Sequence, residues 1–349
     1  MTGTKLPIYL GIETLENLAL FDDEYPNLNA IAKNHSVIYI NCTTEILNKI
    51  ISDTESDISQ FCLRNDIEII AAKDIFDIVG QDIDKLSDCA RGMYFLNVTP
   101  EEAENLSYKY GVIVQSDSKY NDNIFQFSYR KHTEKGEKYD GVENGWKNLL
   151  ANLKILPSNS LVVTDRYLFG DKEKDIKPGI ENLKMVLDAL LPTNLYTSFH
   201  ILVIFRKHNK LHGERLNQIC GQIKSYLKNI RNYDIKFEMI SDDTIHPRKI
   251  ISNYYVLNCD KGFQLFSPIN HNIIYSNNEL RISSILYDPG NTLSDTELKI
   301  TVKSLYQIYK FSEELRLQIM NGINESNKKI IGDNVLIKRF IIDFLKSKN

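Results

Sequence analysis

A histidine and two cations follow a short apolar run in the second half of the chain. His246, Arg248 and Lys249 come soon after the strand predicted at residues 235–240, and Asn253 follows four residues after Lys249. On extended chain, residues two apart point to the same side, so His246 and Arg248 are expected to face one ligand. A guanidinium grips phosphate oxygens with two hydrogen bonds, and an imidazole binds anions, attacks or transfers protons. The pattern predicts a phosphate-binding site supported by Lys249 and Asn253, with an ordinary surface loop as the alternative.

The spacing resembles the H-x-K-x-x-x-x-D signature of the phospholipase D superfamily, with His246, Arg248 and Asn253 at its three positions. The stretch HPRKIISNYYVLNCDKGFQLF is also similar to the phospholipase D-like C-terminal domains of MIT-containing proteins, which are binding modules. The resemblance covers about residues 155–270 and implies a phospholipase D-like sheet.

Two departures from that signature bear on activity. Arginine keeps the charge of the usual lysine, whereas asparagine removes the carboxylate that would orient the histidine. Active members of the superfamily pair two such motifs, and no second motif of this pattern is found here. The resemblance therefore implies phosphodiester binding, and hydrolysis by His246 stays open as an alternative, for example in a homodimer that brings two copies together.

Two other apolar runs of the second half also end in charged residues. Asp165 and Arg166 end the first run, and Lys207 follows the second. Ligands collect at the carboxyl ends of strands in open parallel sheets. If the strands are neighbours, we expect one locally basic rim. The alternative is that Asp165 and Arg166 cap the loop that follows them. The expected rim comprises Asp165, Arg166, Lys207, His246 and Arg248.

Three carboxylates follow apolar runs of the first third. They are Glu13, Glu45 and Asp117. Carboxylates that converge at strand ends could bind Mg²⁺ and leave positions open for phosphates. The arrangement resembles that of PIN-domain nucleases, which gives a metal-dependent nuclease as an alternative function. Acidic residues are also common at helix starts because they cap them, and the favoured interpretation needs no cofactor.

The first third alternates short apolar runs with segments of helical period. This alternation predicts a parallel sheet with helices on its faces, that is, a Rossmann-like α/β domain at residues 1–120. The clearest helix is expected at residues 100–110, where Thr99 is the N-cap and Pro100 the first position. The predicted strands lie at residues 8–12, 37–41, 67–71, 93–98 and 112–115, and the other predicted helices at 14–20, 28–33, 44–51 and 83–89.

Turn-rich, charged sequence then predicts a linker with one short strand at residues 121–145, and a second α/β domain with C-terminal helices at 146–349. The fold class is therefore α/β, with two consecutive three-layer domains. In the second domain the predicted strands lie at residues 160–165, 199–205 and 235–240, with a hairpin within 245–266. Its helices are predicted at 146–153, 179–190, 211–230, 294–321 and 333–346.

Composition limits the function classes. The net charge is −4, so nucleic acid would have to bind a local basic patch. Five widely spaced cysteines without a CxxC indicate reduced thiols, and no signal peptide or membrane span is evident, which predicts a cytoplasmic protein. We expect a nucleic-acid binder with an accessory role in bacterial nucleic-acid processing or antiviral defence. A scaffold that docks a partner protein is the remaining alternative.

Overall fold

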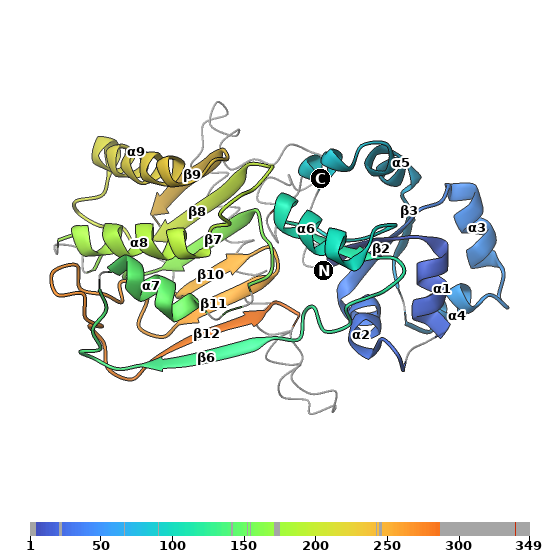
Figure 1. Ribbon diagram of the computed structural model, residues 1–349, viewed down its shortest axis with the longest axis horizontal. Coiled ribbons are helices and arrows are strands. Elements are labelled where there is room, and N and C mark those ends of the chain that lie inside the picture. Colours follow the sequence, from blue (N-terminus) through green and yellow to red (C-terminus); the bar gives the residue numbers. More distant parts are fainter. Residues whose placement is uncertain are drawn as a thin grey trace. The chain divides into compact units, whose positions relative to one another are not determined.

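In the computed structural model the chain forms two compact units. Their described parts are residues 5–127, 285–286 and 339 (unit 1) and Ser128–Ser284 (unit 2) (Figure 1). The tail helices predicted at 294–321 and 333–346 lie outside the described residues. The structure describes residues 5–286 and 339, except for 21–22, 66, 90, 141, 152, 154, 171–174, 242 and 244–245.

Unit 1 is built on a five-stranded, fully parallel sheet with the order β3-β2-β1-β4-β5. Its strands are β1 (Leu6–Leu10), β2 (Ser36–Ile40), β3 (Ile69–Ala71), β4 (Met93–Leu96) and β5 (Ile113–Ser116). The connecting helices are α1 (Ile12–Leu20), α2 (Pro26–His35), α3 (Thr44–Ser52), α4 (Asp57–Asn65), α5 (Lys73–Gln81), the 3-10 helix η1 (Ile83–Asp88) and α6 (Pro100–Tyr110).

Three tyrosines stack across the centre of this sheet. Tyr9 is in register with Tyr39 and Tyr94 on the neighbouring strands, and its ring centroid lies 4.7 Å from that of Tyr39 and 4.5 Å from that of Tyr94. Tyr9 and Tyr94 share a buried cluster with side chains of α5, η1 and α6. These helices therefore cover the tyrosine face, where each aromatic pair adds about 0.5–1.5 kcal/mol beyond simple burial.

Helix α6 begins where its sequence predicts. The Thr99 hydroxyl accepts the backbone N–H of Glu102 at 3.2 Å, and the Glu102 carboxylate accepts the backbone N–H of Thr99 at 2.9 Å. This reciprocal capping box satisfies two N–H groups that the first turn leaves free. The helix ends at Gly111, whose φ of 66° is the left-handed conformation that glycine adopts at low cost.

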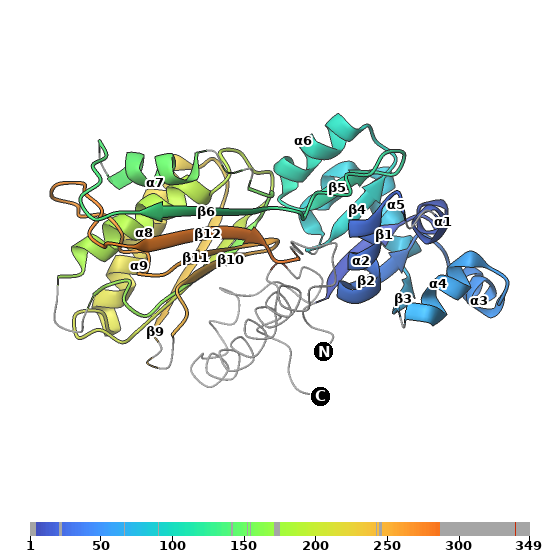
Figure 2. The same ribbon diagram turned by 90° about the horizontal axis from the view of Figure 1, so that it is seen from below.

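Unit 2 is built on a seven-stranded mixed sheet with the order β6-β12-β11-β10-β7-β8-β9. Strands β7, β8 and β9 are parallel, and the remaining neighbours pair antiparallel, with β6 along the outer edge (Figure 2). The helices are α7 (Val142–Leu150), α8 (Lys177–Leu190) and α9 (Gly213–Ile230). The strands are β6 (Ser128–Thr133), β7 (Ser160–Asp165), β8 (Phe199–Phe205), β9 (Ile235–Ser241), β10 (Lys249–Ser252), β11 (Tyr255–Cys259) and β12 (Asn278–Ser284).

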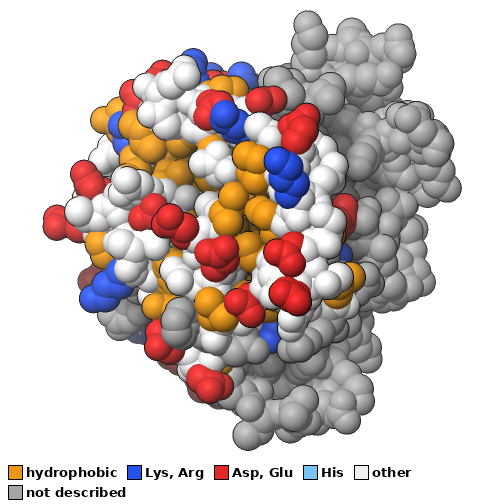
Figure 3. Space-filling view, turned by 90° about the vertical axis from the view of Figure 1, so that its right-hand side faces the viewer, with side chains coloured by type: hydrophobic (Ala, Val, Ile, Leu, Met, Phe, Trp, Pro, Cys, Tyr) orange, Lys and Arg blue, Asp and Glu red, His pale blue; other side chains and the backbone are white. Residues whose placement is uncertain are grey.

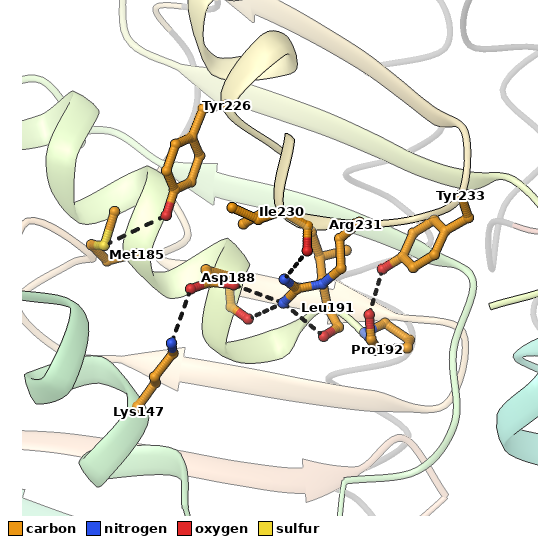
Figure 4. A network of polar contacts seen from close by, with 9 residues as sticks. All are labelled: Lys147, Met185, Asp188, Leu191, Pro192, Tyr226, Ile230, Arg231 and Tyr233. Atoms are coloured by element: carbon orange, nitrogen blue, oxygen red, sulfur yellow. Dashed lines mark hydrogen bonds and ion pairs between the residues drawn. The ribbon is translucent and has the colours of Figure 1, made fainter. Parts of the chain in front are cut away.

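Buried polar side chains join the helices of unit 2 to its loops. The Asn182 amide on α8 accepts the Trp146 indole N–H at 3.2 Å and the Phe266 backbone N–H at 2.9 Å, and donates to the Phe266 carbonyl at 2.7 Å. A second network centres on Asp188, whose carboxylate lies 2.8 Å from the buried Arg231 guanidinium and 3.3 Å from the Lys147 ammonium (Figure 4). These contacts fix α7, α8 and the α9–β9 loop together.

The structure confirms an α/β fold with two sheets, and most predicted strands and helices lie within a few residues of their expected bounds. The sequence predicted a linker with one short strand at 121–145. Strand β6 falls within it and pairs along its whole length with β12 as part of the second sheet. Helices α4 and α5 and strand β12 were absent from the sequence-based prediction.

No helix in the described part of the chain combines the length and apolar character needed to cross a bilayer. All five cysteines are free thiols, in agreement with their spacing. Burial raises the pKa of Cys62, Cys89 and Cys220 to about 11, so these thiols stay protonated near neutral pH.

Candidate functional site

The carboxyl ends of β7, β8 and β9 form one edge of the unit 2 sheet, because these three strands are parallel neighbours. Strand β10 pairs antiparallel with β7, with Lys249 opposite Thr164. The segment that leads into β10 therefore reaches the same edge. We call Arg166, Tyr167, His246 and Arg248 at this edge the basic rim.

Within the basic rim, His246 and Arg166 are in direct contact. A terminal nitrogen of Arg166 lies 2.9 Å from Nδ1 of His246, and the His246 side chain is exposed. A guanidinium has N–H donors and no acceptor. Nδ1 of His246 is therefore the acceptor of this hydrogen bond, and the ring proton lies on Nε2, where it can be donated to a ligand.

Tyr167 lies near both guanidinium groups of the rim. The central carbon of Arg166 lies 5.8 Å from the centroid of the Tyr167 ring, and that of Arg248 lies 5.3 Å from it. Both distances are within the range of a cation–π contact. The sequence prediction did not include Tyr167, although an aromatic residue directly after the Asp165–Arg166 pair was a usable signal.

Neither arginine of the basic rim forms an ion pair with a described residue. Arg166 and Arg248 have no carboxylate within 4.0 Å among the described residues. Arg248 donates to the backbone carbonyl of Asp260, and the Nε–H groups of Arg166 and Arg248 are enclosed without a partner there.

Asp165 is fully buried beneath the rim and supports two loops. Its carboxylate accepts the backbone N–H of Tyr167 at 2.8 Å and that of Phe263 at 2.6 Å. Burial raises the pKa of Asp165 to about 6, although these two hydrogen bonds and the charge of Arg248 act in the opposite direction. Gly262 (φ 92°) permits this approach, since a Cβ there would lie 2.6 Å from the Asp165 carboxylate.

Lys207 also lies at this edge, two residues beyond the end of β8. Its ammonium lies 4.0 Å from the Asp243 carboxylate, and both side chains are largely exposed. An exposed pair of this kind is weak, so Lys207 could exchange this partner for a ligand at little cost.

The structure does not bring Lys249 into the basic rim. Successive residues of extended chain point to opposite faces, so Lys249 projects away from Arg248. It shares its face of the sheet with Arg281, two strands away. Burial lowers the pKa of Lys249, and the charge of Arg281 lowers it further.

Asn253 lies at the other end of β10 and is fully buried. Its side-chain oxygen accepts the backbone N–H groups of Asn159 and Ser160 at 3.1 and 3.0 Å. It therefore anchors the start of β7 and lies outside the rim. The sequence pattern grouped Asn253 with His246 because it could not show that β10 separates them.

The carboxylates of unit 1 do not form the predicted magnesium site. Among the described residues, no three His, Cys, Asp or Glu side chains are grouped so as to hold a metal ion. Glu13 and Glu45 lie in the first turns of α1 and α3, and hydrogen bonds from the Glu45 N–H and the Thr43 hydroxyl lower the pKa of Glu45. Asp117 follows β5, which β4 separates from β1.

The basic rim thus offers two guanidiniums and one imidazole N–H to an anion, without a metal cluster in the described residues. Neither a protein-family model nor a curated protein sequence matches this chain, so the chemistry of the rim rests on its own geometry.

Proposed function

We propose that this protein binds the phosphodiester backbone of a nucleic acid through the basic rim of unit 2. The observation that carries the proposal is the pair of guanidiniums, Arg166 and Arg248, held against Tyr167 without a carboxylate partner among the described residues. Both guanidiniums lie near the same ring, and guanidinium groups form strong, charge-assisted hydrogen bonds with phosphate oxygens. The resemblance to phospholipase D-like binding modules supports the same ligand class.

A nucleic acid suits unit 2 better than an isolated phosphate does. Residues 128–284 carry 23 Lys and Arg side chains against 17 acidic ones, so a backbone with many phosphates gains favourable contacts outside the rim. An accessory role in bacterial nucleic-acid processing or antiviral defence is the setting that we propose for such a module.

The geometry favours binding over hydrolysis. A histidine that attacks phosphorus through Nε2 needs a lone pair on that atom, and a carboxylate at Nδ1 normally provides it by holding the proton there. In this protein Arg166 occupies Nδ1 and leaves the proton on Nε2. His246 is thereby suited to donate a hydrogen bond to a phosphate oxygen.

Binding of a fluorescently labelled oligonucleotide, followed by anisotropy between about 50 and 200 mM salt, tests the proposal. We expect Arg166→Ala and Arg248→Ala each to weaken binding about tenfold or more, and to reduce the slope of log K against log salt by about 1. His246→Gln, which keeps an N–H donor, should retain more affinity than His246→Ala. Because Arg248 also lies near Asp165, thermal melts must show that each variant is folded.

Lys228→Ala is the matched control. Lys228 lies in the last turn of α9, near the amino ends of the strands, where it pairs with Asp234 at 3.1 Å. Its removal deletes one positive charge from the opposite edge of the sheet, so affinity should change little. If Lys228→Ala and Arg166→Ala lose the same amount of affinity, the loss depends only on net charge. That result would reject the basic rim as the binding site. If the wild-type protein cleaves the oligonucleotide and His246→Gln does not, the protein hydrolyses its ligand with His246 and does not only bind it.

A further inference from the structure

A cavity of about 690 Å³ lies in unit 1, and none of the features discussed above uses it. It lies where β2 and β4 end, beneath α5, η1 and α6, and next to the residue that follows β5. In open parallel sheets, ligands bind beyond the carboxyl ends of the strands, at the point where the strand order reverses. The order β3-β2-β1-β4-β5 reverses between β1 and β4, so the cavity lies at that position.

The lining of the cavity combines an apolar wall with several polar residues, most of them exposed. This combination, and a volume between about 300 and 1,000 Å³, is typical of small-molecule sites. The apolar wall comes from α5, η1, α6 and the end of β4, and includes Phe76, Val79, Ile83, Phe95, Leu96, Val98 and Leu106. The polar groups are Asn41, Asn97, Glu102, Asn105 and Asp117.

Most of these polar groups are exposed to solvent and have no side-chain partner among the described residues. The side chains of Asn41, Asn97, Asn105 and Asp117 make no hydrogen bond or ion pair with another described residue. Glu102 differs, because one of its oxygens belongs to the capping box with Thr99. Three amides supply both donors and acceptors, and the Asp117 carboxylate supplies acceptors. The cavity can therefore recognise a ligand that has both kinds of group along its edge.

The charge of the lining selects against phosphate. The residues that line the cavity include two carboxylates and no Lys, Arg or His. Residues 1–127 as a whole carry 21 acidic and nine basic side chains. On the face of unit 1 that carries α3 and α4, acidic side chains stand around apolar ones (Figure 3). A phosphorylated ligand in the cavity would place its negative charge near the carboxylates of Glu102 and Asp117, without a basic side chain among the described lining residues to compensate it.

We propose that the cavity of unit 1 binds an uncharged nucleoside and discriminates against the corresponding nucleotide. A nucleobase is flat and apolar on its faces, which suits the Phe76 side of the cavity, and carries donors and acceptors on its edge, which suit Asn97 and Asn105. The ribose hydroxyls can donate to Asp117. The site is independent of the basic rim, so its failure would leave the nucleic-acid proposal unaffected.

Isothermal titration of the full chain with adenosine, guanosine, cytidine and uridine, and with each 5′-monophosphate, tests the inference. We expect at least one nucleoside to bind, and its monophosphate to bind at least tenfold more weakly. No binding by any nucleoside, or equal or tighter binding of the monophosphate, would overturn the inference.

Gly80 offers a way to block the cavity without disturbing the core. It lines the cavity from α5, and a Cβ added there would meet no atom within 4 Å. Gly80→Phe should therefore fold, fill part of the space and reduce nucleoside affinity at least tenfold. Gly80→Ala is the matched control and should retain affinity, since it adds one carbon. Unchanged affinity in a folded Gly80→Phe protein would show that the ligand binds elsewhere and would reject this cavity.

Discussion

Units 1 and 2 both place helices against a sheet, yet they use polar side chains differently. In unit 1, the tyrosine face is an aromatic stack covered by apolar side chains, and helix α6 begins with a local capping box. In unit 2, fully buried polar side chains bond to backbone groups far away in sequence. Asp165, Asn182 and Asn253 bond to residues 98, 84 and 94 positions away.

Charge separates the two units as well. Acidic side chains dominate residues 1–127, whereas basic ones are in excess in residues 128–284. The chain's net charge of −4 conceals this division, so it is a poor guide to the ligands of either unit. The comparison teaches that one chain can divide its charge between two units, and the two opposite ligand preferences that we propose depend on this division.

The largest effect expected from the comparison is in the buried network of unit 2. Asp188→Ala should lower the free energy of unfolding by about 3–5 kcal/mol, because it leaves the buried Arg231 guanidinium without its carboxylate. Urea denaturation followed by circular dichroism measures this loss. Lys147→Ala removes the more exposed partner of the same carboxylate and should cost less than about 1 kcal/mol. If the two variants lose similar amounts of unfolding free energy, burial of the Asp188–Arg231 pair would not explain the effect of Asp188→Ala.

The next effect concerns Asp165 and depends on pH. Its pKa rises from 3.8 to about 6 on folding, so between these values the folded state binds its proton more tightly than the unfolded state. The resulting stabilisation is complete below pH 3.8 and is lost as the pH rises through 6. The full difference is about 3 kcal/mol at most.

The measurement for Asp165 is the difference in unfolding free energy between the wild-type protein and Asp165→Asn, taken from pH 4 to pH 7. This difference isolates one carboxyl from the others that titrate in the same range. Asparagine does not titrate, so the wild type should lose stability relative to the variant as the pH rises. A difference that is constant with pH would mean that the Asp165 carboxyl titrates alike in both states.

The smallest effect is expected in unit 1, at the capping box of α6, whose hydrogen bonds are local and exposed. Thr99→Ala removes the hydroxyl that caps the helix and should cost about 1 kcal/mol. Thr99→Ser, which keeps the hydroxyl, should restore most of the loss. Thermal melts of the two variants check this, and a loss as large as that of Asp188→Ala would remove the contrast between the units.

The sequence was a good guide where local signals are strong. Helix α6 and strand β8 have their predicted bounds, because Thr99, Pro100 and Gly111 mark the helix and an unbroken apolar run marks the strand. Helix α5 was missed, since Gly80 lies near its end and it follows β3 after a single residue. Strand β12 was missed because Asn278, Glu279 and Arg281 interrupt its apolar pattern, although Asn278 is buried.

The sequence alone determined that the chain forms two α/β units, because hydrophobic period and turn residues act over a few neighbouring positions. It also indicated that Arg166, His246 and Arg248 follow or precede strands. Only the tertiary structure decided which residues share an edge. Strand β4 lies between the strands that Asp117 and Glu13 follow. Asn253 and His246 lie at opposite ends of β10. Lys249 points to the opposite face from Arg248, because successive residues of a strand alternate. Such relations depend on pairing between distant segments, which no local pattern specifies.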